Sequence, residues 1–105
     1  MDINPVATGH SLVIPKFHTP NIYEAPHIWA SVTFNGVQRL ARAVKKTIKP
    51  DAINILQANG SGAAQTVLHL HIHVVPRWIG DDIKMNWGAK SGDMDVISHL
   101  SEEIQ

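Results

Sequence analysis

Residues 66–75 read Thr66-Val67-Leu68-His69-Leu70-His71-Ile72-His73-Val74-Val75. Polar and apolar side chains alternate along this stretch, as in a strand that buries one face. Because successive side chains of a strand point to opposite faces, we expect the three imidazoles to share one face. Leu70, Ile72 and Val74 are then expected to fill the buried face. Pro76 is expected to close this strand, since proline cannot donate to a ladder.

The flanking segments predict a small α+β domain around this strand. A short apolar segment at residues 10–15 predicts another strand, and residues 52–58 predict a third. Apolar residues at three- and four-residue steps from Trp29 to Ile48 predict a long helix, with a basic, solvated face. Gly36 within this helix indicates close packing with another element. Residues 93–104 predict a short terminal helix.

Length and composition predict one globular domain covering residues 1–105. Nine Lys and Arg residues balance nine Asp and Glu residues, and this zero net charge argues against a nucleic-acid partner. The chain has no cysteine, which excludes disulfides, thiolate metal sites and a cysteine nucleophile. The apolar runs are too short to span a bilayer, and the start does not resemble a signal peptide. We therefore expect a cytoplasmic protein without a membrane partner.

Two chemistries fit a row of three imidazoles. Alternate histidines on a strand can coordinate a divalent metal, since zinc accepts nitrogen ligands. Alternatively, one imidazole attacks as a nucleophile while its neighbours orient it and handle protons. The row has no acidic residue inside or beside it, which favours the nucleophile. The small polar residues between Asn59 and Thr66 favour it too, because such a loop suits an oxyanion such as phosphate.

The row and its surroundings resemble the histidine triad (HIT) family of nucleotidyl hydrolases and transferases. The family pattern alternates three histidines with apolar residues and ends in two more apolar residues, as residues 69–75 do. Pro76-Arg77 follow as in many members. Residues 2–16 resemble the upstream block of the family, and Asn59-Gly60 with Gln65-Thr66-Val67 match its approach to the triad. The resemblance covers about residues 2–78.

The resemblance implies a role for each matching histidine. His71 would attack the α-phosphorus of a nucleotide and form a covalent nucleotidyl-histidine that water then cleaves. His73 would lie at the leaving group, and His69 would orient His71 through its backbone carbonyl. His10 would support this group. The resemblance also implies which residues bind the nucleotide. Asp2 and Ile3 would line the ribose, and Asn59, Gln65 and Thr66 would lie near the phosphate. His71 and His73 would contact the nucleotide as well.

Three features depart from the family pattern. Many members carry glycine at the position of Ala64, where the backbone often needs the freedom of glycine. The asparagine that often touches phosphate falls at Ala58, although Gln57 and Asn59 flank it. A full HIT domain also has a hairpin and an apolar base clamp upstream of the block that resembles residues 2–16. We expect weaker recognition of the base where that segment is lacking.

The resemblance implies a HIT-like fold, in which an antiparallel sheet carries one long helix and a short C-terminal helix. It also implies a homodimer that pairs through the long helix and an edge strand. The expected function is hydrolysis or transfer at the α-phosphate of purine nucleotide phosphoramidates or dinucleoside polyphosphates, without a metal or other cofactor. The alternatives are a nucleotide-binding module that has lost turnover and a metal-binding module that uses the histidine row. Trp78 and Trp87 are candidates to stack a base, whereas Trp29 is expected in the core or a dimer interface.

Overall fold

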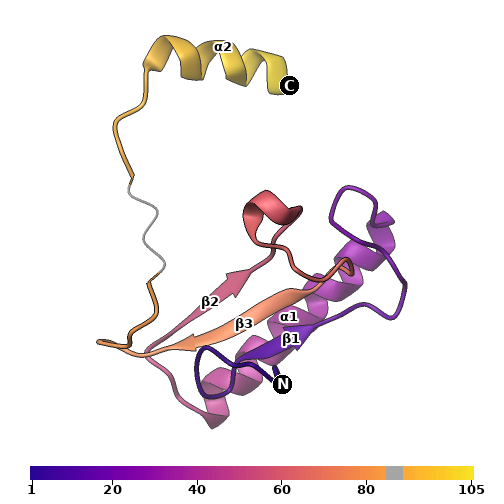
Figure 1. Cartoon of the computed structure of the whole chain (residues 1–105), viewed down its shortest axis with the longest axis vertical. Helices are drawn as coiled ribbons and strands as arrows, with labels where there is room; N and C mark the ends of the chain where they lie inside the picture. The colour runs from indigo at the N-terminus through magenta and orange to yellow at the C-terminus, as the bar shows by residue number, and fades with distance from the viewer. Residues whose placement is uncertain (85–88) are drawn as a thin grey trace.

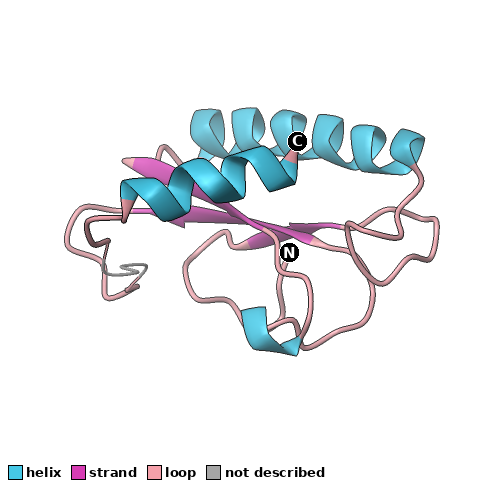
Figure 2. Ribbon diagram, turned by 90° about the horizontal axis from the view of Figure 1, so that it is seen from above, coloured by secondary structure: helices cyan, strands magenta, loops and turns pink. Residues whose placement is uncertain are grey.

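A computed structural model describes residues 1–84 and 89–105. Its body is a three-stranded antiparallel sheet with one long helix on one face (Figure 1 and Figure 2). The elements follow the order β1 (Ser11–Val13), α1 (His27–Thr47), β2 (Ala52–Leu56), the 3₁₀ turn η1 (Ser61–Ala63), β3 (Ile72–Arg77) and α2 (Met94–Ile104). This arrangement confirms the predicted α+β class, with an antiparallel sheet, one long helix and a short C-terminal helix. Trp87 lies outside the described residues.

The central strand β3 supplies most of the core, because it pairs with β1 on one side and β2 on the other. Val74 lies opposite Ser11 of β1 and Ile55 of β2, and it is fully buried. The core cluster joins Ile72 and Val74 to Val37 and Val44 of α1. The predicted burial of Leu70, Ile72 and Val74 is confirmed.

The strand predicted at residues 66–75 is observed as β3, which starts later than predicted, at Ile72, and ends later, at Arg77. Residues 66–71 precede the sheet, and the Leu70 N–H donates to the Thr19 carbonyl at 2.7 Å rather than to a neighbouring strand. Pro76 does not close β3, which continues to Arg77 with Pro76 opposite Ile53 of β2. The pairing with β1 stops at Ser11, opposite Val74, so β1 requires no donor from Pro76.

The predicted helix is confirmed, and its two ends have local causes. The Pro26 carbonyl accepts the N–H groups of Trp29 and Ala30 at the start of α1. Lys49 adopts a left-handed φ of 55° directly before Pro50, which ends the helix. A Cβ on Gly36 would lie 3.2 Å from Cγ1 of Val13, which confirms the predicted close packing, here with β1.

The remaining predicted strands are shorter than expected, and the terminal helix forms. β1 covers Ser11–Val13 of the predicted residues 10–15, and β2 covers Ala52–Leu56 of residues 52–58. The Asp93 side chain accepts the N–H groups of Asp95 and Val96 and thereby caps α2. In Figure 1 α2 stands apart from the sheet. Neither helix in the described part of the chain is long and apolar enough to cross a membrane.

Candidate active site

His71 lies directly before β3, and its ring is held by the backbone of the residue two positions earlier. His71 Nδ1 lies 2.7 Å from the His69 carbonyl oxygen. A carbonyl only accepts, so His71 Nδ1 carries the proton and donates it. With this proton on Nδ1, the neutral form of the ring has its lone pair on Nε2, as a nucleophile requires.

His73 and His10 form a hydrogen-bonded chain whose direction is fixed by Val6. The Val6 N–H donates to His10 Nδ1 at 3.2 Å, so the proton of neutral His10 is on Nε2. His10 Nε2 lies 2.8 Å from His73 Nδ1, which must accept it. His73 consequently carries its proton on Nε2. The His73 ring packs edge-on against His71, with ring centroids 5.1 Å apart.

The ring of His69 makes its hydrogen bonds to residues 15 and 18, although it lines one hollow together with His71. Residue 69 precedes β3 in the chain. His69 Nε2 lies 3.1 Å from the Pro15 carbonyl, and Nδ1 lies 3.2 Å from Nδ1 of His18. The proton on His69 is therefore on Nε2, and His18 donates to the other nitrogen.

Burial and neighbouring imidazoles keep His73 neutral. Partial burial lowers the pKa of His73 below its ordinary value, and the nearby His71 and His10 lower it further. The Asn4 N–H lowers the pKa of Asp2, whose carboxylate lies 3.5 Å from His10 Nε2. The site thus combines one carboxylate with rings that donate and accept in a fixed order.

Asp2, His10 and His73 bring three potential metal-ligand atoms within 4.8 Å of one another, a group that the sequence pattern did not indicate. His10 argues against a metal at this point. Its Nδ1 already accepts the Val6 N–H, so Nε2 must keep its proton. A metal bound at Nε2 would require deprotonation of the second ring nitrogen as well. The contacts favour a hydrogen-bonded chain.

The loop before the triad is a closed turn. Gln65 is buried, and its side chain accepts the Gly60 N–H at 2.7 Å while donating to the carbonyls of Pro20 and Val67. The Asn59 side chain pairs with the Gln57 amide and accepts the Ile22 N–H. Gln65 and Asn59, two of the three residues predicted near the phosphate, therefore brace the loop with their side chains. Thr66 lies exposed beside them.

Ala64 occupies the position that often carries glycine in the family. It follows η1 with a left-handed φ of 65°. Its N–H donates to the Ser61 carbonyl at 3.0 Å, so the turn closes in spite of the Cβ. The departure noted in the sequence thus coincides with a backbone conformation that L-residues rarely adopt.

Two hollows flank the histidines. One, of about 260 Å³, is lined by His73, Leu56, Gln57, Ala58, Ala63 and Ala64. The other, of about 90 Å³, is lined by His69, His71, Leu12, Ile14 and Val67. His71 and His73 therefore lie between a hollow bounded by the turn and a smaller apolar one. Ile3, predicted at the ribose, is 92% exposed.

Sequence reasoning missed the contacts that orient the rings. Val6 and Pro15 act through backbone atoms, which no side-chain pattern reveals. His18 is exposed, and its ring contacts His69 edge-on. The only signal for His18 was that it is a histidine in a proline-containing segment.

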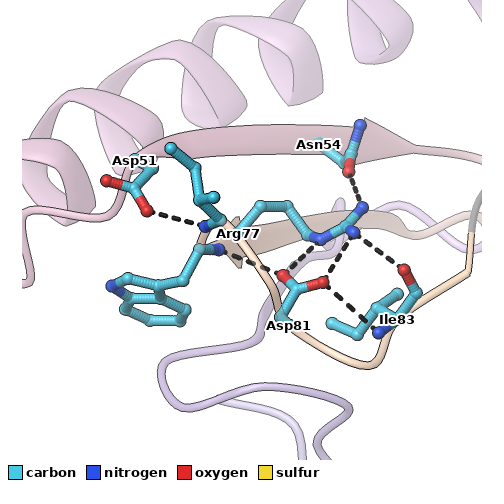
Figure 3. A network of polar contacts seen from close by, with 7 residues as sticks. Asp51, Asn54, Arg77, Asp81 and Ile83 are labelled. Carbon is cyan, nitrogen blue, oxygen red and sulfur yellow. Dashed lines mark hydrogen bonds and ion pairs between the residues drawn. The ribbon is translucent and has the colours of Figure 1, made fainter.

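A polar network fixes the chain where it leaves β3 (Figure 3). Arg77 makes a bidentate pair with Asp81, at 2.7 and 2.8 Å, and donates to Asn54 on β2. Asp81 also accepts the Trp78 N–H, and its pKa is lowered first by Arg77. Asp51 accepts the Ile79 N–H. Asp81 therefore holds this turn against the sheet edge.

Comparison with known proteins identifies relatives along nearly the whole chain. The protein named hit of Bacillus subtilis is 39% identical over 99% of this chain and 74% of its own length. An adenosine 5'-monophosphoramidase of Saccharomyces cerevisiae is 35% identical over 99% of this chain and 64% of its own length. An adenylylsulfatase of Arabidopsis thaliana is 39% identical over 87% of this chain and 45% of its own length.

Crystal structures show the same fold. A Streptococcus mutans protein superposes with a TM-score of 0.94 and 37% identity, covering 100% of this chain and 67% of its own. A HIT family member from Bacillus subtilis superposes with a TM-score of 0.91 and 36% identity, covering 99% and 76%. The family model described as the HIT domain matches residues 1–78, which include His10 and all three triad histidines. The chain belongs to the HIT family.

Proposed function

We propose that the protein is a nucleotide hydrolase or transferase acting at the α-phosphate of purine nucleotide phosphoramidates or dinucleoside polyphosphates. One observation carries the proposal: His71 Nδ1 donates to the His69 carbonyl and leaves Nε2 as a free base. HIT relatives named adenosine 5'-monophosphoramidase and adenylylsulfatase support the substrate class. The chain spans less than two thirds of both relatives, so their activities enter here as part of the proposal.

In the first step His71 Nε2 attacks the α-phosphorus, and the bond from phosphorus to the leaving nitrogen or oxygen breaks. The electron pair of that bond departs with the leaving group. The His71 ring becomes an imidazolium that keeps its Nδ1 proton, and the His69 carbonyl stabilises this charge. His73 Nε2–H donates a hydrogen bond to the departing atom, because the His10 chain holds its proton there, and the departing atom takes its own proton from solvent water, so that His73 stays neutral.

In the second step a water oxygen attacks the same phosphorus, the bond to His71 Nε2 breaks, and the attacking water releases one proton to solvent. The lone pair returns to Nε2, and the product is a nucleoside monophosphate. A phosphate group in the hollow beside Ala58 and Ala64 would lie against His73, whose ring packs edge-on against His71. No step needs a metal ion.

A covalent adduct tests this proposal. His71→Gly is expected to reduce turnover of an adenosine phosphoramidate by at least about a thousandfold, because it removes the nucleophile. Mass spectrometry of quenched wild-type protein should locate an adenylyl group on the peptide containing His71. His27→Gly, at the exposed start of α1, is the matched control and should keep wild-type turnover. An adduct on another histidine, or turnover by the His71 variant, would contradict the mechanism.

A nucleotide-binding module without turnover is the second candidate. Ala64 in a strained conformation and the closed turn before the triad favour it, because both restrict how the turn accommodates a phosphate. In that case adenosine monophosphate would bind in calorimetry while no adduct forms and no phosphoramidate is consumed.

We also propose that two copies form a homodimer through α1 and β2. Ile28, Val32 and Phe34 of α1 are exposed, with Phe34 at 57%, as is Ile55 on the edge strand β2. Phe34, Val37 and Ile55 line an apolar groove of about 410 Å³ between these elements. A contiguous apolar surface of this kind is typical of an interface. Light scattering is expected to give twice the chain mass of 11.6 kDa.

A further inference from the structure

The peptide that joins His69 to Leu70 makes a hydrogen bond on each of its two sides. Its carbonyl oxygen accepts the Nδ1 proton of His71 at 2.7 Å, and its N–H donates to the Thr19 carbonyl, also at 2.7 Å. This peptide is trans, so its C=O and N–H point in opposite directions within one plane. The position of the Thr19 carbonyl therefore determines where the acceptor of the His71 ring can lie.

The hydrogen bond from Leu70 to Thr19 is shielded from water. Both residues are buried, with 1% of Leu70 and 2% of Thr19 exposed. Leu70 precedes β3 and takes its acceptor from the connection between β1 and α1 instead of from a neighbouring strand. A buried N–H that loses its acceptor stays unsatisfied, which costs about as much as the lost hydrogen bond. The folded protein therefore keeps this bond closed.

The two hydrogen bonds of this peptide strengthen each other. Donation from the Leu70 N–H draws electron density onto the His69 carbonyl oxygen, because hydrogen bonds in a chain polarise one another. The effect is largest when attack on phosphorus leaves a positive charge on the His71 ring, whose Nδ1–H points at that oxygen. The Thr19 carbonyl then lies at the far end of a chain of dipoles that stabilises this charge.

Pro20 restricts the direction of the Thr19 carbonyl. A residue before proline is confined to extended backbone, which narrows the range of the ψ angle that directs its carbonyl. The Pro20 carbonyl itself accepts a hydrogen bond from the Gln65 side chain at 2.6 Å, and that side chain accepts the Gly60 N–H. Two successive carbonyls, of Thr19 and Pro20, therefore hold the peptide behind His71 and the turn that precedes the triad.

The geometry points to Thr19 and Pro20 as a positioning element for His71. Thr19 acts through the His69–Leu70 peptide, so it is a positioning residue and not a catalytic one. Pro20 acts one step further away, by restricting Thr19. The inference rests on the proposed function, in which His71 is the nucleophile, and it adds the residues that keep the acceptor of that ring in place.

Pro20→Gly tests this role, because it releases the backbone of Thr19 and leaves every histidine of the triad unchanged. We expect kcat for an adenosine phosphoramidate to fall at least about tenfold with little change in KM, since a poorly oriented nucleophile slows the chemical step. Pro20→Ala should fall between the wild type and Pro20→Gly, because alanine has less backbone freedom than glycine. Pro26→Gly, at the exposed end of the same connection, is the matched control and should keep both constants.

The tautomer of His71 gives a readout that does not depend on turnover. In ¹⁵N NMR spectra of the neutral ring, the wild type and Pro26→Gly should carry the proton on Nδ1, whereas Pro20→Gly should show a mixture of both tautomers. A purely structural role would lower the Tm and leave the tautomer unchanged.

The outcomes separate this inference from the proposed function. A folded Pro20→Gly variant with the wild-type tautomer and kcat would overturn the positioning element and leave the proposed function intact. If Pro20→Gly does not fold, Pro20→Ala is compared with Pro26→Gly by the same two measurements. A wild type that consumes no phosphoramidate would overturn the proposed function, and the tautomer would still decide whether Pro20 orients His71.

Discussion

Backbone groups decide the chemistry of the histidines at the scale of single residues. The His69 carbonyl places the lone pair of His71 on Nε2, and the Val6 N–H determines that His73 donates from Nε2. The Pro15 carbonyl keeps the proton of His69 on Nε2, which leaves the lone pair of that ring on Nδ1. These contacts fix which ring nitrogen donates and which accepts before a ligand arrives, which reduces the reorganisation that a phosphoryl transfer requires.

The lowered pKa of His73 predicts how stability depends on pH. An unfolded histidine titrates near 6.5, whereas burial keeps folded His73 neutral to lower pH. Below pH 6.5 the unfolded chain binds a proton that the folded chain does not, so the free energy of unfolding falls as the pH decreases from 7 to 5. His73→Gln should make this fall smaller in urea unfolding at the two pH values.

The exposed His27 provides the control for that measurement. His27→Gln should reproduce the wild-type loss of stability between pH 7 and pH 5. If His73→Gln shows the same loss as the wild type, the folded state does not disfavour the charged form of His73.

At the scale of elements, the turn between β2 and β3 contains a strained residue, Ala64, whose strain can be measured. Ala64→Gly is expected to raise the free energy of unfolding by about 0.5–1 kcal/mol, because relief of the left-handed Cβ contact exceeds the added chain entropy. Ala63→Gly is the matched control, since Ala63 lies within η1 and does not have a positive φ. It should be slightly destabilising. Chemical denaturation measures the free energy of unfolding of both variants. An Ala64→Gly variant less stable than the wild type would contradict the strain at Ala64.

The sequence predicted the elements better than their bounds. Regular apolar spacing predicted α1 within two residues, because one face of the helix packs on the sheet over its full length. The same alternation predicted a ten-residue strand, whereas β3 begins at Ile72. Leu70 is buried without strand pairing because its N–H bonds to the Thr19 carbonyl, and residue alternation cannot distinguish the two cases.

For the site, the sequence predicted the residue types better than the contacts that these residues make. The triad and His10 were identified from side-chain types, and the structure brings His10, His71 and His73 together. Gln65 and Asn59 were predicted near the phosphate, which stays a prediction, and the structure adds that their side chains brace the turn. Contacts made by backbone atoms, such as those of Val6 and Pro15, depend on the folded path and leave no pattern in the sequence.

At the scale of the whole molecule, a small core and a large exposed surface couple stability to concentration. The core cluster contains four buried residues, while Phe34 and Ile55 remain exposed on the single chain. If the dimer buries them, raising the protein concentration from 1 to 100 μM should raise the Tm by about 6 °C, because mass action favours the folded dimer. Phe34→Glu should abolish this dependence, since it places two carboxylates at the interface. Ser61→Glu, on the exposed turn η1, is the control and should keep the dependence of the Tm on concentration in calorimetric scans. A wild-type Tm that does not change with concentration would contradict a dimer that dissociates as it unfolds.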